Sequence, residues 1–163
     1  MPRQALVTGL GFITPIGNDR QTVAQSLREG RHGLGPVEFL NNPDLTTKVT
    51  GTIKDFTAAT PNWRDWRYPE RYDIPREILR SLSPHALYAI CGMEQAIEDA
   101  GITREDLSDG ETGRYCASAG STMVLHHHVS RLMATKGERC GPLGIVASIA
   151  GTLNFNLAAH YGI

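Results

Sequence analysis

The segment from Ala5 to Gly17 constrains the fold more than any other part of this 163-residue chain. It begins as a short apolar run and continues through Gly-Leu-Gly and Thr-Pro to a third glycine. An apolar run that ends in glycine and proline is typical of a buried strand followed by a turn. We therefore expect a strand close to the N-terminus, with glycines that let the strand and turn backbones pack closely.

The spacing of these glycines does not fit a dinucleotide-binding loop. That fingerprint is Gly-x-Gly-x-x-Gly leading directly into a helix, so that a phosphate meets the helix N-terminus. Gly9 and Gly11 fit, but Thr14 stands where the third glycine is required, and the next glycine is Gly17. Pro15 also removes a backbone donor where a phosphate would need one. Nucleotide binding is therefore disfavoured here.

Composition is that of an ordinary globular protein of one domain, with 40% hydrophobic and 20% charged residues. A formal net charge of -1 gives no electrostatic footprint for nucleic acid or for a polybasic membrane surface. Apolar runs stay well short of the ~20 residues that a membrane span needs. The N-terminus lacks the long apolar region of a signal peptide. We expect a cytoplasmic protein without nucleic-acid or membrane partners.

The three cysteines do not suggest a disulfide framework or a zinc site, because their number is odd and their spacing wide. They are Cys91, Cys116 and Cys140. None follows a sharp strand-to-helix turn with an obvious base, which a nucleophile would need. Each is interpreted as a small buried or partly buried residue.

The best-defined helix follows Ser83, a good N-cap residue, and Pro84, which suits the first helical position. Its apolar residues keep helical spacing until Gly101, a typical C-terminal stop. An earlier helix is expected to be capped by Asn18, with Val23 and Leu27 on its apolar face. The sequence predicts helices over residues 19–29, 84–100, 122–136 and 145–160, with a helical turn at 103–106.

Strands are expected at residues 48–53, where apolar and polar residues alternate, and at 114–119, a run of small residues entering Gly120-Ser121. Strands that alternate with helices indicate a layered α/β fold. Residues 61–75 carry Trp63, Trp66 and several arginines. This segment is either a contact surface, since aromatic and arginine residues are enriched at interfaces, or a loop packed over the core.

Three consecutive histidines, His126, His127 and His128, raise the question of a metal site. Adjacent residues on a helix point about 100° apart, so three in a row cannot converge on one ion. We therefore expect no metal site and interpret the run as a partly exposed helix face.

The opening segment resembles the N-terminus of the β-ketoacyl-acyl carrier protein synthases, in the condensing-enzyme family. Members begin with a strand that ends in Val-Thr-Gly-Leu-Gly, followed by Thr-Pro or a similar pair and by Gly-Asn. Here Val7–Gly11, Thr14-Pro15 and Gly17-Asn18 fit. The order is kept along the whole chain, and two pieces, Arg28–Gly30 and Met93–Ile97, resemble type I elongation synthases most. The further similar segments are Ser26–Gly33, Val49–Phe56, Met93–Gly101, Arg114–Ser121 and Ala150–Ile163.

This resemblance implies the N-terminal half of a thiolase-like layered α/β/α/β/α fold, incomplete in this chain, with residues 1–163 as the N-terminal part of a ketosynthase domain. It also implies a decarboxylative Claisen condensation in fatty acid or polyketide synthesis. An acyl chain moves from an acyl carrier protein onto a cysteine, and malonyl-carrier protein loses carbon dioxide so that its carbanion attacks the thioester. The acyl group arrives on the carrier's phosphopantetheine, so no separate cofactor is expected. A homodimer is implied.

The resemblance assigns no catalytic residue to this chain. In the family, the nucleophilic cysteine lies beyond the Tyr-Gly pair, which is Tyr161-Gly162 here, and two oxyanion-stabilising histidines belong to the second half of the fold. The chain alone is therefore expected to be inactive and to need the remaining C-terminal half.

The resemblance does carry over three pocket-lining positions. Met123 falls where the family places an apolar residue at the far end of the acyl tunnel. Gly144 and Ile145 fall where the family often has an aromatic residue and a valine near the dimer partner, and Gly144 would leave the pocket wider. The alternative is that all three are ordinary core positions.

Two other functions fit the same residues. One is a non-catalytic partner that resembles a chain-length factor, which keeps the fold without the cysteine. The other is a free-standing binding module of the same fold.

Overall fold

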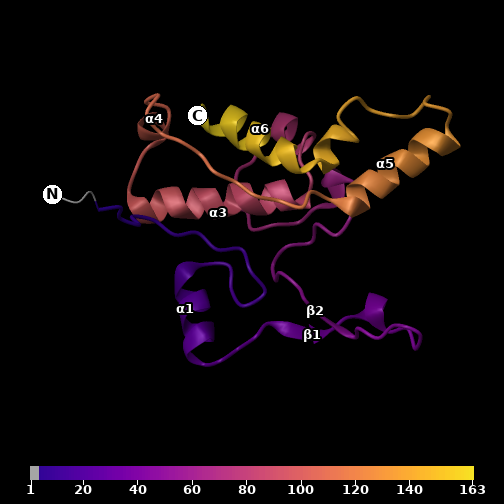
Figure 1. The fold of residues 1–163 in the computed structure, drawn as a ribbon, viewed down its shortest axis with the longest axis horizontal. Coiled ribbons are helices and arrows are strands. Elements are labelled where there is room, and N and C mark those ends of the chain that lie inside the picture. The colour runs from indigo at the N-terminus through magenta and orange to yellow at the C-terminus, as the bar shows by residue number, and fades with distance from the viewer. Residues whose placement is uncertain (1–3) are drawn as a thin grey trace.

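The structure, a computed structural model, describes residues 4–163. Figure 1 shows α3 near the centre, α6 beside it, and a lower lobe that contains the first helix and a small sheet. The elements in chain order are α1 (Arg20–Arg28), β1 (Leu34–Pro36), η1 (Glu38–Leu40), β2 (Val49–Gly51), η2 (Trp63–Asp65), α2 (Arg76–Leu79), α3 (Pro84–Ala100), α4 (Arg104–Leu107), α5 (Thr122–Ala134), η3 (Val146–Ser148) and α6 (Ala150–Tyr161).

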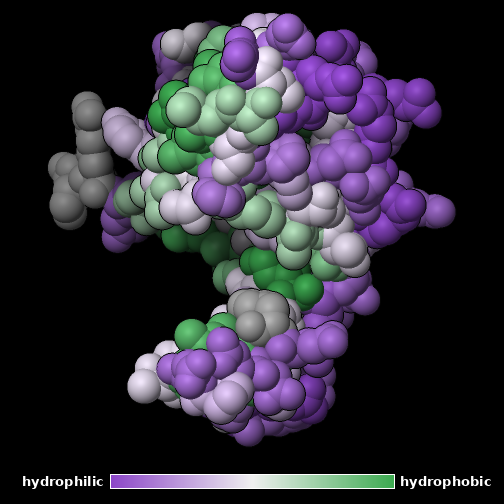
Figure 2. Space-filling view, turned by 90° about the vertical axis from the view of Figure 1, so that its right-hand side faces the viewer, coloured by the Kyte–Doolittle hydropathy of each residue, from purple (hydrophilic) through white to green (hydrophobic). Residues whose placement is uncertain are grey.

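The only regular strand pairing within residues 4–163 is a two-stranded sheet of β1 and β2. The strands are antiparallel, with Leu34 opposite Gly51 and Pro36 opposite Val49. The strand expected at residues 48–53 is thus confirmed in its central part. Seen from the end of α5, the molecule is hollowed between its larger upper part and the lower lobe (Figure 2).

Two expected strands, near Ala5–Val7 and at 114–119, are not hydrogen-bonded as strands in the part of the chain that the structure describes. Both segments lack a strand neighbour, and a ladder needs two chains. Residues 111–120 nevertheless alternate between exposed and half-buried, as an extended chain with one covered face does. Leu6 is 81% exposed and Tyr115 fully exposed. The prediction of strands was therefore wrong in pairing, although the extended pattern is present at residues 111–120.

Helix α3 is the centre of the hydrophobic core. Its side chains Leu87, Ile90 and Cys91 are completely buried, and the helix packs against α6. It ends at Gly101, whose φ of 66° is left-handed, as predicted from the glycine. Ser83 occupies the N-cap position, but its hydroxyl lies 2.7 Å from Nδ1 of His85 and makes no capping bond.

The glycines of the opening segment allow close backbone packing, as predicted, but the neighbour is helix α3, which the sequence alone did not identify. A Cβ at Gly9 would lie 2.8 Å from Cβ of Ala100, and one at Gly11 would lie 2.7 Å from the carbonyl carbon of Gly92. The Gln95 side chain accepts a hydrogen bond from the Phe12 amide at 3.1 Å. The opening segment is thus held on α3 by backbone proximity and by a side-chain bridge.

Helix α1 is capped differently from the prediction. Asp19, and not Asn18, accepts a hydrogen bond from the Thr22 amide at 2.8 Å. Val23 is buried as expected, but Leu27 is 66% exposed, so the buried face is narrower than predicted.

Helix α4 starts with the predicted turn, now seen as a capping box between Thr103 and Asp106. The long helix expected at 145–160 is instead a short η3 followed by α6.

Residues 61–75 are packed over the core, which favours the second interpretation of this segment. Trp66 and Tyr72 are buried members of the core, and Trp63 and Tyr68 pack against it. The Trp66 indole donates to the Thr60 carbonyl at 2.8 Å.

Over the described residues, no helix combines the length and apolar character that crossing a membrane would take.

Candidate functional site

The three cysteines are free, and one of them is chemically inert. Cys91 is completely buried on α3, and burial raises the pKa of its thiol to about 12. Since the thiolate is the nucleophile, this thiol stays protonated at neutral pH. Cys116 and Cys140 are half-buried. The interpretation of Cys91 as a packing residue is thus supported.

The pocket-lining residues inferred from the resemblance lie around α5. Met123 is half-buried in the first turn of α5. It lines a hollow of about 480 Å³, together with Pro61, His126 and Ser130. Gly144 and Ile145 lie in the loop after α5, where Gly144 is buried and Ile145 is 40% exposed. Gly144 lines a second hollow, described below, so Met123 and Gly144 line different hollows.

Gly144 does not leave an open space. A Cβ at this position would lie 2.5 Å from Nδ1 of His128, so the His128 ring fills the volume that a side chain would take. A residue on the neighbouring helix thus takes the place of a side chain at Gly144, and the expectation that Gly144 leaves an acyl pocket wider stays a prediction.

A second hollow, of about 560 Å³, lies between α5 with the loop after it and the segments around η2 and the end of α2. We call it the basic groove. Its walls come from segments far apart in the sequence. Four arginines and two histidines line it, without any aspartate or glutamate. The lining residues are Pro61, Asn62, Trp63, Arg64, Arg80, Leu82, Val124, His127, His128, Arg131, Arg139, Gly141, Pro142, Leu143, Gly144 and Ala147.

The histidine run contributes to both hollows. His127 and His128 are half-buried, and their rings meet edge to face with centroids 5.2 Å apart. Burial is the main cause that holds the pKa of His128 below its ordinary value, and the positive charges of the nearby His127 and Arg131 lower it further. Within residues 4–163, no group of three or more potential ligands is placed to hold a metal ion.

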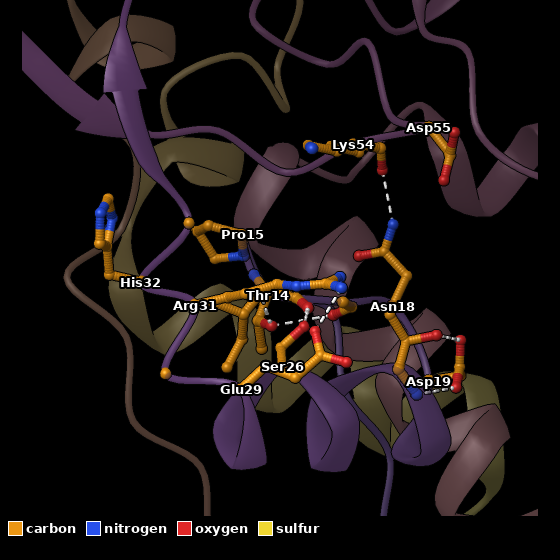
Figure 3. A pocket seen from close by; sticks show the side chains of 15 residues that line it. Thr14, Pro15, Asn18, Asp19, Ser26, Glu29, Arg31, His32, Lys54 and Asp55 are labelled. Atoms are coloured by element: carbon orange, nitrogen blue, oxygen red, sulfur yellow. Dashed lines mark hydrogen bonds and ion pairs between the residues drawn. The ribbon is translucent and has the colours of Figure 1, made fainter.

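The glycine-rich turn forms a third hollow, of about 550 Å³, in which its polar groups hold one another (Figure 3). The amides of Thr14 and Gly17 donate to each other's carbonyl oxygens at 3.0 and 3.2 Å. The Ser26 hydroxyl donates to the Ile16 carbonyl at 2.7 Å, and the Asn18 side-chain amide donates to the Lys54 backbone carbonyl at 2.6 Å. The backbone donors that a phosphate loop would offer are therefore used within the turn.

Sequence reasoning missed two polar clusters that connect helices. Gln95 bonds the opening segment to α3. Glu94 accepts hydrogen bonds from the Tyr161 hydroxyl and from Arg104, both at 2.9 Å. The sequence carries only a weak signal for them, namely adjacent polar residues inside an apolar helix. The basic groove was missed too, since its arginines meet only through the tertiary fold.

Comparison with known proteins identifies the family. The model of the beta-ketoacyl synthase N-terminal domain matches residues 3–160. A 3-oxoacyl-acyl-carrier-protein synthase 2 from Synechocystis is 31% identical over 161 residues, 98% of this chain and 36% of the relative. Synthase 1 of Escherichia coli K12 is 30% identical over 166 residues, 99% of this chain and 37% of the relative. The chain thus spans little more than a third of the length of these relatives.

Solved structures agree on the fold. A beta-ketoacyl synthase from Burkholderia phymatum has a TM-score of 0.76 at 21% identity, covering 96% of this chain and 36% of that one. The ishigamide ketosynthase/chain length factor has a TM-score of 0.66, also at 21% identity, covering 95% and 36%. Both share the thiolase-like fold that the sequence resemblance implied. This chain therefore belongs to the beta-ketoacyl synthase family, since the model of that family's N-terminal domain matches nearly all of it.

Proposed function

We propose that this chain is part of a β-ketoacyl-acyl carrier protein synthase that condenses an acyl thioester with malonyl-carrier protein, with loss of carbon dioxide. The observation that carries the proposal is the family match over residues 3–160, which is continuous and nearly complete for this chain. Several relatives in that match are named as 3-oxoacyl-acyl-carrier-protein synthases. The pathway would be fatty acid or polyketide synthesis.

The unpaired segments support a requirement for further polypeptide of the same fold. Leu6 and Val7 are each about 80% exposed, and Tyr115 is fully exposed, all on extended segments without strand neighbours within residues 4–163. Exposed apolar strand faces are normally covered in a stable domain. We infer that the remaining part of the synthase fold, which would bring the nucleophilic cysteine and the oxyanion-stabilising histidines, covers them. The chain by itself is then inactive.

Helix α5 and the loop after it support a second copy as a partner. Their exposed apolar residues lie on one continuous stretch of chain, and Met133 is 75% exposed. Contiguous exposed apolar surface of this kind marks interaction sites. We propose a homodimer through this region. The residues are Leu125, Val129, Leu132, Met133, Leu143, Ile145, Val146 and Ile149.

The other parts of the proposal follow from the reaction. The acyl and malonyl groups would arrive on the phosphopantetheine of an acyl carrier protein, so that no separate cofactor is needed. Such a synthase would work in the cytoplasm, where its carrier protein is found.

The test starts from the protein in its own cells. The coding sequence is tagged, the tagged product is purified, and its intact mass and any co-purifying polypeptide are determined. The material is then incubated with acyl- and malonyl-carrier protein, and 3-oxoacyl product is measured by mass spectrometry. We expect product from the purified assembly and none from the isolated 163-residue chain. A well-folded assembly that forms no product would contradict the proposal.

A non-catalytic partner is the second candidate, and one observation favours it. One structural neighbour is described as a ketosynthase/chain length factor, so the fold occurs in such pairs. This role predicts that a separate, active ketosynthase co-purifies with the tagged chain. It also predicts that the tagged chain's own subunit has no cysteine at the nucleophile position, and that activity is lost when the nucleophilic cysteine of the co-purifying ketosynthase is replaced.

A further inference from the structure

The short helix α4 lies beside the C-terminal end of α6, and the two helices meet over one carboxylate of α3 (Figure 1). Three groups converge on the same oxygen, Oε1 of Glu94. The Tyr161 hydroxyl and Nη2 of Arg104 each lie 2.9 Å from it, and Nε2 of His160 lies 3.6 Å from it. We call these four residues the α4 latch. Its members come from three helices, so the position of α4 on α6 depends on how they share one carboxylate.

The His160 ring is placed as a neutral group that accepts a hydrogen bond. Its Nε2 lies 3.3 Å from Nη2 of Arg104, and a guanidinium group can only donate. A neutral imidazole has one nitrogen without a hydrogen, so Nε2 is the acceptor here and Nδ1 carries the hydrogen. Burial, followed by the positive charge of Arg104, holds the pKa of His160 below its ordinary value, against the opposing effect of Glu94.

The groups that face this ring come from every helix of the latch. Glu94 faces it from α3 and Arg104 from α4. On α6 itself, the Tyr161 ring lies edge to face with the imidazole, with centroids 4.7 Å apart. Burial raises the pKa of Tyr161, so its hydroxyl stays neutral over the range in which a histidine titrates.

Protonation of His160 reverses the arrangement at one atom. A proton taken up from the solvent leaves a hydrogen on both ring nitrogens, so Nε2 can no longer accept from Arg104. The charged ring repels the guanidinium group and attracts the Glu94 carboxylate. Exposure decides which cation leaves, since the His160 side chain is 7% exposed and that of Arg104 52%. The guanidinium group can regain water, whereas the buried imidazolium needs the carboxylate as its partner.

Arg104 is the residue that ties α4 to α6. Its guanidinium group also donates to the His160 carbonyl at 3.4 Å and lies 5.2 Å from the centroid of the Tyr161 ring. Helix α4 has only four residues, and a helix of this length is not stable by itself. Leu107 is the buried residue of α4. Loss of the Arg104 contacts should therefore loosen α4, while the core contacts between α3 and α6 remain.

We propose that the α4 latch is an acid-sensitive switch, in which uptake of a proton by His160 displaces Arg104 from Glu94 and releases α4 from the end of α6. The latch is closed above about pH 6.5 and opens as the pH falls through the lower folded pKa of His160. A local opening of this kind leaves the core folded. The switch goes beyond the proposed condensation, and its test measures no synthase activity, so the two proposals can fail separately.

The experiment is hydrogen–deuterium exchange, measured by mass spectrometry on the tagged protein together with any polypeptide that co-purifies with it. The pH is varied from about 7.5 to about 5, and the rates are corrected for the intrinsic pH dependence of amide exchange. A peptide from the middle of α3 is the internal reference for opening of the core. We expect the protection of residues 102–110, relative to this reference, to fall at least about tenfold, the effect of losing one charge-assisted hydrogen bond.

Three variants identify the groups responsible. His160→Gln cannot take up a proton, so α4 should stay protected over the whole pH range. Arg104→Gln should leave α4 poorly protected even at pH 7.5, and its exposed position makes it a safe second variant if His160→Gln does not fold. The matched control is His85→Gln, a half-buried histidine at the start of α3 and outside the latch, which should keep the release of α4.

Two outcomes for the histidine would overturn the proposal. One is protection of α4 that does not depend on pH in the wild-type protein, and the other is an unchanged pH dependence in His160→Gln. High protection of α4 at pH 7.5 in Arg104→Gln would overturn it as well, because α4 would then be held by contacts other than the latch.

Discussion

The backbone of Gly11 lies against the backbone of Gly92 on α3, with no room for a side chain between them. A Cβ at Gly11 would lie 2.7 Å from the Gly92 carbonyl carbon and 3.0 Å from the Ala96 amide nitrogen. Backbone atoms of a helix cannot move aside without disturbing its hydrogen bonds. The glycines of the opening segment are therefore required by packing, and this contact positions the first segment of the family fold on its central helix.

Gly11→Ala should destabilise the chain by about 2 kcal/mol or more, as overpacking of a core contact does. The measurement is urea unfolding monitored by circular dichroism. Gly151→Ala on α6 is the control, because a Cβ there meets no atom within 4 Å. Helix propensity predicts that it is neutral or stabilising by up to about 1 kcal/mol. Equal stabilities of the two variants would contradict the packing argument.

Gln95→Leu should cost about 3 kcal/mol, because it leaves several buried polar groups without partners. Gln95 accepts from the Phe12 amide at 3.1 Å and donates to the Asn18 carbonyl at 2.8 Å and to the Tyr72 hydroxyl at 2.6 Å. Gln21→Leu, on the exposed face of α1, is the matched control and should change stability by less than about 0.5 kcal/mol. A loss at Gln95 no larger than at Gln21 would mean that the bridge is unimportant. The measurement is the free energy of unfolding in urea.

The parts of the fold that could be predicted are those with local signals. The ends of helix α3 follow from Pro84 and Gly101, and α4 from the turn expected at residues 103–106, since these signals act within one turn. Strand pairing at residues 114–119 could not be judged in the same way, because a ladder depends on a chain segment distant in sequence. The extended pattern was visible, but the presence of a neighbour was not.

The candidate site was predictable only in part. The sequence resemblance predicts that Met123 and Gly144 line an acyl pocket. In the structure they line two different hollows beside α5, and the acyl-pocket role stays a prediction. The filling of the Gly144 space by the His128 ring depends on how the loop crosses α5. The convergence of Arg80 and Arg131 likewise appears only once distant segments are folded together.

Stability should fall on mild acidification because three histidines have lowered pKa values. Burial is the largest cause for His85, His128 and His160 alike. A histidine with a folded pKa below its unfolded value of 6.5 binds more protons when unfolded. The contribution of such a histidine to the free energy of unfolding is therefore complete above its unfolded pKa and is lost as the pH falls through its lower folded pKa. The urea midpoint should be constant above about pH 7.5 and should decrease towards about pH 5.5.

His85→Gln tests this origin, because removing one such histidine should flatten the decrease below about pH 6.5. The acidic groups act in a different window. Backbone hydrogen bonds lower the pKa of Asp19, Asp106 and Asp109 from 3.8, so their contribution is lost only at more acidic pH. An unchanged slope in His85→Gln, with the whole decrease shifted below about pH 4, would assign it to these carboxylates.

Met123→Ala should extend the range of acyl chains that the complete synthase accepts, if Met123 ends the acyl tunnel. The residue is half-buried at the first turn of α5 and lines a hollow of about 480 Å³. Truncating it adds volume where the end of the acyl chain would lie. The ratio of kcat/KM for long acyl groups to that for short ones should therefore rise by up to about tenfold, since about 1.4 kcal/mol of additional apolar contact corresponds to a factor of ten. Competition between acyl-carrier proteins of different length measures the ratio. The control is Leu27→Ala, 66% exposed on α1 and outside the proposed dimer region, which should leave the ratio unchanged. An unaltered preference in Met123→Ala would make Met123 an ordinary packing residue.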